Sequence, residues 1–327
     1  MQINETFDRF NDLKILIIGD LMIDAYIWGK VDRISPEAPV PVVNVKKREN
    51  RLGGAGNVVL NIQSLGATPI VCSVIGNDPA GDALFTLFEE KNISTDGIIR
   101  SENRPTTIKE RIIAGTQQIA RIDSETTTAI SSEETNQLIN KIKNLASNVD
   151  VIVFEDYDKG VITENLITEI IDFANTNNIP TVVDPKKRNF LFYRNATLFK
   201  PNLKELKEGL GIEFDVNNDT ELKNVVDLLK SKMNLNGVFL TLSEKGVYID
   251  FNNNKISIPA HIRQIADVSG AGDTVISIAA CCLALQLEPE KIAGLANLGG
   301  GLVCEKLGVV PIDKVILLNE ATKIFES

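Results

Sequence analysis

The sequence predicts an α/β protein built on a doubly wound, mostly parallel sheet with helices on both faces and a small β-sheet lid. Three observations carry this prediction. Short apolar runs rich in β-branched residues alternate with longer segments of helical periodicity. Several of the short runs end in Asp, Asn or Ser, as strands that lead into a ligand site do. Two stretches, residues 23–50 and about 98–125, interrupt the alternation.

The apolar runs of strand length are KILIIGD, PIVCSVIG, DVIVFED, TVVDP, TLFKPN and GVFLTLS. Helical spacing and length occur at residues 55–65, 79–91, 133–147, 163–177 and 219–234. Parallel sheets bind ligands beyond the carboxyl ends of their strands. The polar residues at those ends are therefore the first candidates for a site: Asp20, Asn77, Asp156, Asp184, Asn202 and Ser243.

The two interrupting stretches read as antiparallel strand pairs with turn residues. We expect them to form a lid that covers the site and excludes water. Ordinary edge hairpins explain the pattern nearly as well. Residues 1–327 as a whole are expected to form a single α/β domain that includes this lid.

Composition excludes several classes of protein. The formal net charge of −10 over 327 residues argues against general binding to nucleic acid or anionic membranes. Four cysteines in apolar segments, no secretory leader and no apolar run of membrane-spanning length predict the cytoplasm. The single histidine, His261, rules out mechanisms that need two.

The run DVSGAGDT at residues 267–274 precedes a long apolar helical segment. Gly270, Ala271 and Gly272 can open the first turn so that its free N–H groups bind an anion. Asp273 can then take a proton from an attacking hydroxyl during phosphoryl transfer. A loop in which Asp273 merely caps the helix is the alternative.

A second small-residue turn, GGAGN, opens another apolar helical segment. Here Gly53 and Gly54 let a ligand approach the backbone, and Asn57 offers an amide to a hydroxyl. Upstream, Asp20 and Asp24 in GDLMID suit sugar hydroxyls. A tight turn, helix capping and a metal role stay open for these residues.

Together, GGAGN with VIGND downstream and DVSGAGD near the C-terminus resemble the PfkB (ribokinase-like) family of carbohydrate kinases over essentially the whole chain. Within that family, GDLMIDAYIWGKVDRISPEAPVPVV, TTIKERII, QQIARID, EDYDKG and VVDPKKRNFLFYRNATLFKPNLKEL resemble the kinases of D-glycero-β-D-manno-heptose 7-phosphate. Some of those kinases are fused to an adenylyltransferase. We expect this chain to be the stand-alone form.

The resemblance implies roles for matching positions. Asp273 matches the catalytic base, and Gly270, Ala271 and Gly272 match the anion hole. The substrate-binding positions it implies, or that lie in the segments quoted, are Asp20, Asp24, Gly53, Gly54, Asn57, Lys109, Arg111 and Asp156. Those implied for ATP are Lys186, Asn202, Glu205, Thr241, Ser243, Gly246 and Asn297. Asn202 and Glu205 would organise Mg²⁺ through water, and Asp267 and Ser269 would hold a monovalent cation such as K⁺.

Two positions depart from the family pattern: Val268 replaces a common Thr, and Glu155 stands where a small residue is frequent. Glu155 either reaches a sugar hydroxyl or ends its strand. An anionic substrate must also meet a local basic group in this acidic protein. The candidates for that group are Arg33, Arg104, Lys109, Arg111 and Lys159.

The expected reaction is transfer of the ATP γ-phosphoryl group to the anomeric hydroxyl of the heptose phosphate, by a homodimer joined through its lids. A kinase of fructose, ribose or another sugar, and a non-catalytic sugar-binding module, remain as alternatives. A dinucleotide-dependent oxidoreductase is disfavoured because GDLMID follows the first strand where GxGxxG would be needed.

Overall fold

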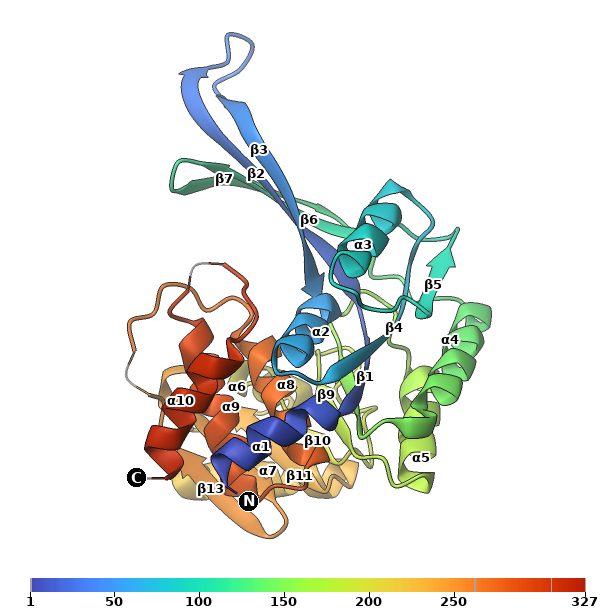
Figure 1. Cartoon of the computed structure of the whole chain (residues 1–327), viewed down its shortest axis with the longest axis vertical. Helices are drawn as coiled ribbons and strands as arrows, with labels where there is room; N and C mark the ends of the chain where they lie inside the picture. Colours follow the sequence, from blue (N-terminus) through green and yellow to red (C-terminus); the bar gives the residue numbers. More distant parts are fainter. Residues whose placement is uncertain (1, 262, 307, 327) are drawn as a thin grey trace.

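The computed structural model describes residues 2–261, 263–306 and 308–326 and places them in two sheets flanked by helices (Figure 1). The strands of the larger sheet are β1 (Lys14–Gly19), β4 (Thr68–Gly76), β5 (Gly97–Ser101), β8 (Val151–Glu155), β9 (Thr181–Asp184), β10 (Leu198–Phe199), β11 (Gly237–Thr241), β12 (Val247–Phe251) and β13 (Asn254–Ile258). Their order across the sheet is β13-β12-β11-β10-β9-β8-β1-β4-β5.

The sheet is parallel from β5 to β11, and β12 and β13 form an antiparallel edge. The mostly parallel sheet predicted from sequence is thus confirmed. Each of the six apolar runs becomes a strand of this sheet. The edge hairpin of β12 and β13 was not predicted, because its alternation is short and follows a tight 3₁₀ turn, η3 (Ser243–Lys245).

The helices connect these strands, and the five predicted from periodicity are present. They are α2 (Ala55–Ser64), α3 (Pro79–Glu89), α4 (Ser132–Leu145), α5 (Glu164–Thr176) and α7 (Asp219–Met233). The others are α1 (Ile3–Arg9), α6 (Leu203–Leu210), α8 (Ala271–Ala284), α9 (Pro289–Val303) and α10 (Lys314–Phe325), with short 3₁₀ turns η1 (Phe10–Asp12) and η2 (Ala146–Asn148).

Strand alternation divides the core into two layers, one on each face of the sheet. Along β1, Ile15 and Ile17 pack with α1, α2, α3, α8, α9 and α10. Leu16 and Ile18 point the other way and pack with α4, α5, α6 and α7. Residues on both faces are fully buried, which explains why the central strands read as continuous apolar runs.

The smaller sheet, called the lid below, contains β2 (Leu21–Ile34), β3 (Pro41–Gly54), β6 (Thr107–Ala114) and β7 (Gln117–Ser124) in the order β3-β2-β6-β7. It projects from the body as a long arm above α2 (Figure 1). Residues 98–101, which we expected in the lid, instead belong to β5. The reason is burial: Ile98 is core and Ile99 packs against the opposite layer, so this segment completes the larger sheet.

Among the described residues, no helix is both long enough and apolar enough to cross a membrane.

Candidate active site

Two helix N-termini meet at the carboxyl end of the larger sheet, and each follows a glycine with positive φ. Gly54 (φ 59°) precedes α2, and Gly270 (φ 79°) precedes α8. A Cβ on Gly270 would lie 3.0 Å from both Asn57 Nδ2 and Val309 Cγ1. Glycine is therefore required there both for backbone conformation and for space. The free N–H groups of the first turn of α8 favour an anion at this point.

Asp273 lies in that first turn, and its carboxylate touches two side chains from distant segments. Its Oδ2 accepts a hydrogen bond from Asn57 Nδ2 at 2.5 Å, and its Oδ1 accepts one from the Tyr157 hydroxyl at 2.7 Å. The side chain is 7% exposed. Burial raises the pKa of Asp273, and the two hydrogen bonds oppose that shift. The structure thus brings together the two predicted motifs, and it adds Tyr157, which sequence reasoning missed.

Asn57 has an unused acceptor at the same place. While its Nδ2 donates to Asp273, its Oδ1 is buried and has no partner among the described residues. A buried amide oxygen without a donor is costly, so this atom marks a place for a ligand hydroxyl or a water.

Asp20 does not face the open site as we expected. It is 1% exposed, and its two oxygens accept the backbone N–H groups of Tyr157, Lys159 and Val161 at 2.9, 3.1 and 3.0 Å. Burial raises the pKa of Asp20 against these bonds. In this structure Asp20 holds the loop that follows β8, and its contact with a sugar stays a prediction.

Asp156, another predicted substrate contact, also lies inside that loop. Its Oδ2 accepts from Asn189 Nδ2 and the Tyr193 hydroxyl, each at 2.9 Å, and its Oδ1 accepts from the Asp158 N–H at 2.8 Å. Burial, together with the charge of Asp20, raises the pKa of Asp156 to about 6. Asp156 therefore stabilises the loop in this structure, and its contact with a sugar stays a prediction.

Glu155 and Asp184 lie side by side below Asp273. They are register partners at the ends of β8 and β9, and both side chains are on the face that packs against α8. Glu155 is 1% exposed, and its Oε2 has no partner among the described residues. Burial and the charges of Asp184 and Asp273 raise its pKa well above the usual range. Glu155 is the last residue of β8, which agrees with the interpretation that it ends its strand. The alternative interpretation, a contact with a sugar hydroxyl, is not needed to explain its position.

Two lysines balance this acidic group. Lys200, with a side chain 3% exposed, pairs with Asp184 at 2.8 Å. Lys186 pairs with Glu205 at 2.6 Å and lies 3.8 Å from Asp184. Burial lowers the pKa of Lys186, but the carboxylates of Asp184 and Glu205 outweigh it and raise that pKa overall. Lys186 thus stays charged at the sheet edge, as a phosphate contact requires.

The predicted NxxE pair forms a capping box at the start of α6. Asn202 Oδ1 accepts from the Glu205 N–H, and Glu205 Oε2 accepts from the Asn202 N–H, both at 2.9 Å. Within the described ranges, no group of three or more His, Cys, Asp or Glu side chains is placed to hold a metal ion. Any Mg²⁺ would therefore need oxygens from a nucleotide and water as well.

The remaining ATP candidates gather beyond β11. Thr241 ends this strand and forms an isolated bridge with Asn202, and Ser243 and Gly246 bound the η3 turn at positive φ. Asn297 of α9 donates to the Pro259 carbonyl at 2.9 Å. Thr241 is thereby next to Asn202, which bonds to Glu205, the partner of Lys186.

The predicted monovalent-cation residues lie on the loop before α8. Asp267 Oδ1 accepts the Ser269 N–H and Asp267 Oδ2 accepts the Gly308 N–H, each at 3.0 Å. Burial and these backbone bonds act in opposite directions on the pKa of Asp267, and the net shift is downward. The carboxylate is therefore ionised and organises the loop.

The root of the lid presents a charged and aromatic surface. Arg111 pairs with Asp24 at 2.5 Å, and the guanidinium carbons of Arg51 and Arg111 lie 4.8 and 5.4 Å from the Tyr26 ring centroid. Gly53 is pressed against the Asp24 carboxylate, where a side chain would collide. Arg51 and Tyr26 were not predicted. Arg51 lies opposite Asp24 only once β2 and β3 are paired, whereas Tyr26 lies two residues beyond Asp24 on the same face of β2.

Of the candidate basic residues, three meet where the lid joins the body. Lys109 and Lys159 share Glu125, at 3.1 and 2.8 Å, and Arg104 donates to the Lys159 carbonyl at 2.5 Å. Arg33 does not join them, because it is exposed near the far end of β2.

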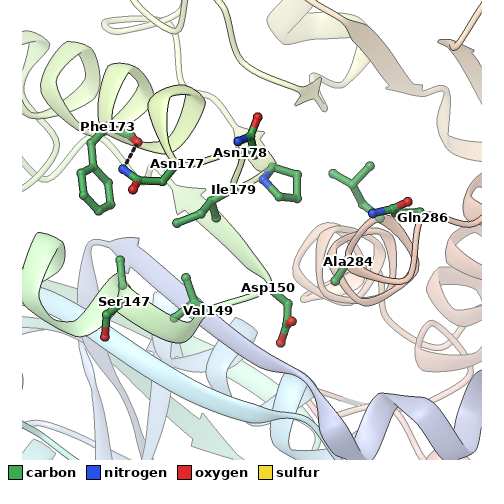
Figure 2. Close-up of a pocket in the computed structure, with 12 residues that line it drawn as sticks. Ser147, Val149, Asp150, Phe173, Asn177, Asn178, Ile179, Ala284 and Gln286 are labelled. Carbon is green, nitrogen blue, oxygen red and sulfur yellow. Dashed lines mark hydrogen bonds between the residues drawn. The ribbon is translucent and has the colours of Figure 1, made fainter.

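A separate pocket of about 370 Å³ lies at the opposite edge of the sheet (Figure 2). Val149 and Asp150 precede β8, Ile179 precedes β9, and Ala284 ends α8. It contains none of the predicted site residues, so the candidate active site is the assembly around Asp273.

A doubly wound sheet whose carboxyl edge carries a helix N-terminus after a glycine, a buried carboxylate and a lid is the architecture of the ribokinase-like fold. Escherichia coli phosphofructokinase-2, in a structure with potassium, superimposes with a TM-score of 0.79 at 18% identity, covering 96% of this chain and 100% of that one. Arabidopsis thaliana ribokinase, complexed with ribose and ATP, gives 0.71 at 15%, covering 94% and 98%. At these identities the likeness shows the fold.

Residues 12–314 match the pfkB family carbohydrate kinase domain, and the chain belongs to this family. It is therefore an ATP-dependent carbohydrate kinase. Its relatives include the bifunctional protein HldE of Aliarcobacter butzleri, 43% identical over 90% of this chain and 61% of that protein. The HldE of Trichlorobacter lovleyi is 40% identical over 94% and 62%. The chain thus spans about 62% of the length of such relatives.

Proposed function

We propose that this kinase transfers the γ-phosphoryl group of ATP to the anomeric hydroxyl of D-glycero-β-D-manno-heptose 7-phosphate. The product, heptose 1,7-bisphosphate, would serve ADP-heptose and lipopolysaccharide core synthesis in the cytoplasm. The likeness of the lid and strand-end segments to heptose phosphate kinases supports this substrate, as do the HldE relatives at about 40% identity.

One observation carries the chemistry: Asn57 fixes Asp273 with its amide nitrogen and keeps a buried, unpartnered oxygen beside it. A sugar hydroxyl at this point can donate to Asp273 Oδ2 or to Asn57 Oδ1. General base catalysis requires the acceptor hydroxyl within hydrogen-bond reach of the base. This pair provides that reach, and Gly272, in the first turn of α8, offers a backbone N–H group to the transferred phosphoryl group.

In the proposed step the hydroxyl oxygen attacks the γ-phosphorus, the bond from that phosphorus to the β–γ bridging oxygen breaks, and ADP leaves. The hydroxyl proton passes to Asp273. The first-turn N–H groups of α8 stabilise charge on the phosphoryl oxygens in transit, and the lid root excludes water. Asp24 would accept from a sugar hydroxyl while Arg111 holds it in place.

For ATP, Lys186 supplies a positive charge at the sheet edge, and the edge beyond β11 would receive the base and ribose. The site suits Mg²⁺ that arrives with the triphosphate, because Glu205 and Asn202 offer oxygens at the sheet edge that reach an ion through water. Bound Mg²⁺ would neutralise charge on the phosphates. The potassium bound by phosphofructokinase-2 is in line with a monovalent cation near Asp267 and Ser269.

The substrate phosphate would bind Lys109 and Lys159, with Arg104 behind them. In this structure Glu125 joins the two ammonium groups, so it occupies the place that a phosphate dianion would take. A homodimer formed through the lids is in keeping with the exposed apolar side chains of Ile34, Val45 and Ile122 on this sheet and of Val40 in the loop between β2 and β3.

A panel of sugars and sugar phosphates with ATP tests the proposal. Heptose 7-phosphate should give the highest kcat/KM, and the product should carry phosphate at the anomeric position. Preference for fructose, ribose or their phosphates would assign another sugar. Sugar binding without ADP formation would indicate a non-catalytic module.

A further inference from the structure

Tyr157 occupies one oxygen of the carboxylate that the proposed function makes the base. Its hydroxyl donates to Asp273 Oδ1 at 2.7 Å, while Asn57 donates to Oδ2 at 2.5 Å. A sugar hydroxyl must reach one of these oxygens. Either Tyr157 withdraws when substrate binds, or it stays and the reaction uses Oδ2.

Hydrogen bonds to the backbone around Tyr157 disfavour movement of its hydroxyl away from Asp273. Its own N–H, and those of Lys159 and Val161, all bond to the buried Asp20. Asp156, immediately before it, is fixed by the three donors described above. A half-buried loop whose backbone N–H groups bond to a buried carboxylate is held in one conformation.

The ring of Tyr157 is held as well. The Lys186 ammonium lies 5.6 Å from the ring centroid, and Lys186 is itself tied to Glu205. Cation–π contact with a partly buried lysine favours the observed rotamer. Backbone and ring constraints therefore both place the hydroxyl on Oδ1.

The second oxygen of the carboxylate, Asp273 Oδ2, has an unused acceptor beside it, namely Oδ1 of Asn57. When a sugar hydroxyl enters, it can donate to Oδ2 and rest beside Asn57 Oδ1, which has no partner among the described residues. The position that can receive a sugar hydroxyl is thus next to Asp273 Oδ2.

We propose that Tyr157 is a positioning residue that stays bonded to Asp273 Oδ1 throughout the reaction and leaves Oδ2 to receive the substrate proton. The inference rests on the proposed role of Asp273 as base. The proton leaves the acceptor hydroxyl as its oxygen bonds to phosphorus, and it ends on Oδ2 of a neutral Asp273 whose Oδ1 still accepts from Tyr157.

The hydrogen bond has a second consequence, on the charge of the base. Burial and the neighbouring carboxylates of Asp184 and Glu155 favour the neutral acid, whereas Lys200 and the donors Asn57 and Tyr157 favour the carboxylate. Because the Tyr157 hydroxyl lowers the pKa of Asp273, removing it should raise that pKa.

Tyr157→Phe tests the proposal, since it keeps the ring over Lys186 and removes only the hydroxyl. We expect kcat to fall at least about tenfold and the acid limb of the kcat/KM profile to move up by about one pH unit. The KM for ATP and the thermal midpoint should change little. Tyr248→Phe is the matched control, because it removes a buried hydroxyl without a partner among the described residues, far from Asp273, and should leave the profile unchanged.

A Tyr157→Phe enzyme with unchanged kcat and profile would overturn the proposal. So would a lower sugar KM at unchanged kcat, since that result means the hydroxyl competes with substrate. The profile can be measured with whichever sugar the wild-type enzyme phosphorylates best. A wrong heptose assignment would therefore appear in the substrate panel and not in this comparison.

Discussion

Asn57 Nδ2 lies 2.5 Å from Asp273 Oδ2 although 216 residues separate them in the chain. The contact exists because α2 and α8 begin at the same edge of the sheet, each after a glycine at positive φ. Sugar recognition and phosphoryl chemistry are thereby joined through a single hydrogen bond.

The first prediction concerns the glycine that permits this contact. Gly270→Ala should destabilise the protein by about 1–2 kcal/mol, because alanine is disfavoured at φ 79°. It should also lower turnover, since the new Cβ would lie 3.0 Å from Asn57 Nδ2. Chemical denaturation and steady-state kinetics measure the two effects.

Gly211→Ala is the control for Gly270→Ala. Gly211 has φ 68°, but a Cβ there would have no neighbouring atom within 4 Å, and the residue ends α6 away from the base. A similar loss of stability with full activity is expected. Equal loss of activity in both variants would show that the effect of Gly270→Ala is global.

The second prediction concerns pH. Burial raises the pKa of Asp273 above the ordinary value for aspartate, and the base must be ionised to work. Activity should therefore fall as the pH falls through this pKa, with a midpoint above about 4. A kcat/KM profile measured where the protein remains folded checks this. A profile that stays flat down to about pH 4 would contradict the assignment.

The third prediction concerns the substrate phosphate. Lys109→Ala should raise the KM for the sugar phosphate about tenfold or more and leave the KM for ATP unchanged, because it removes one of two ammonium groups that meet at Glu125. Lys30→Ala, on the same sheet in an exposed pair with Asp32, should have no effect. A higher KM for ATP in Lys109→Ala would contradict the prediction, because it would mean that Lys109 contacts the nucleotide and not the substrate phosphate.

The fourth prediction concerns stability. Lys200→Met should lower the free energy of unfolding by about 3–5 kcal/mol, because it leaves the buried Asp184 without its 2.8 Å partner. Urea denaturation measures the change. Lys204→Met, at an exposed position of α6, should cost little. If both variants were equally stable, the Lys200–Asp184 pair would contribute nothing measurable.

Much of the fold was predictable because its signals are local. Continuous apolar runs such as KILIIGD identify strands buried on both faces, and periodicity identifies the intervening helices. The assignment of 98–101 to the lid was wrong because pairing with β4 is decided by tertiary contacts of Ile98 and not by the local pattern.

The site was predicted less completely, for a related reason. Motif residues such as Asp273 and Asn57 have a signal in short sequence patterns. Tyr157 lies in the quoted segment EDYDKG, but its contact with Asp273 could not be predicted from that pattern, because it depends on Asp20 holding a loop 137 residues away. The position of Arg51 depends on strand register in the lid. The loop contacts of Asp20 were not predicted, since a polar residue at a strand end has the same pattern whether it faces a ligand or a backbone loop.

Asp273→Asn tests the central claim most directly. The amide is nearly isosteric with the carboxylate but cannot accept the proton, so kcat for heptose 7-phosphate should fall by about 10²–10⁴ while calorimetry still detects sugar binding. Turnover near the wild-type rate would contradict the assignment of Asp273 as the base and, with it, the proposed mechanism.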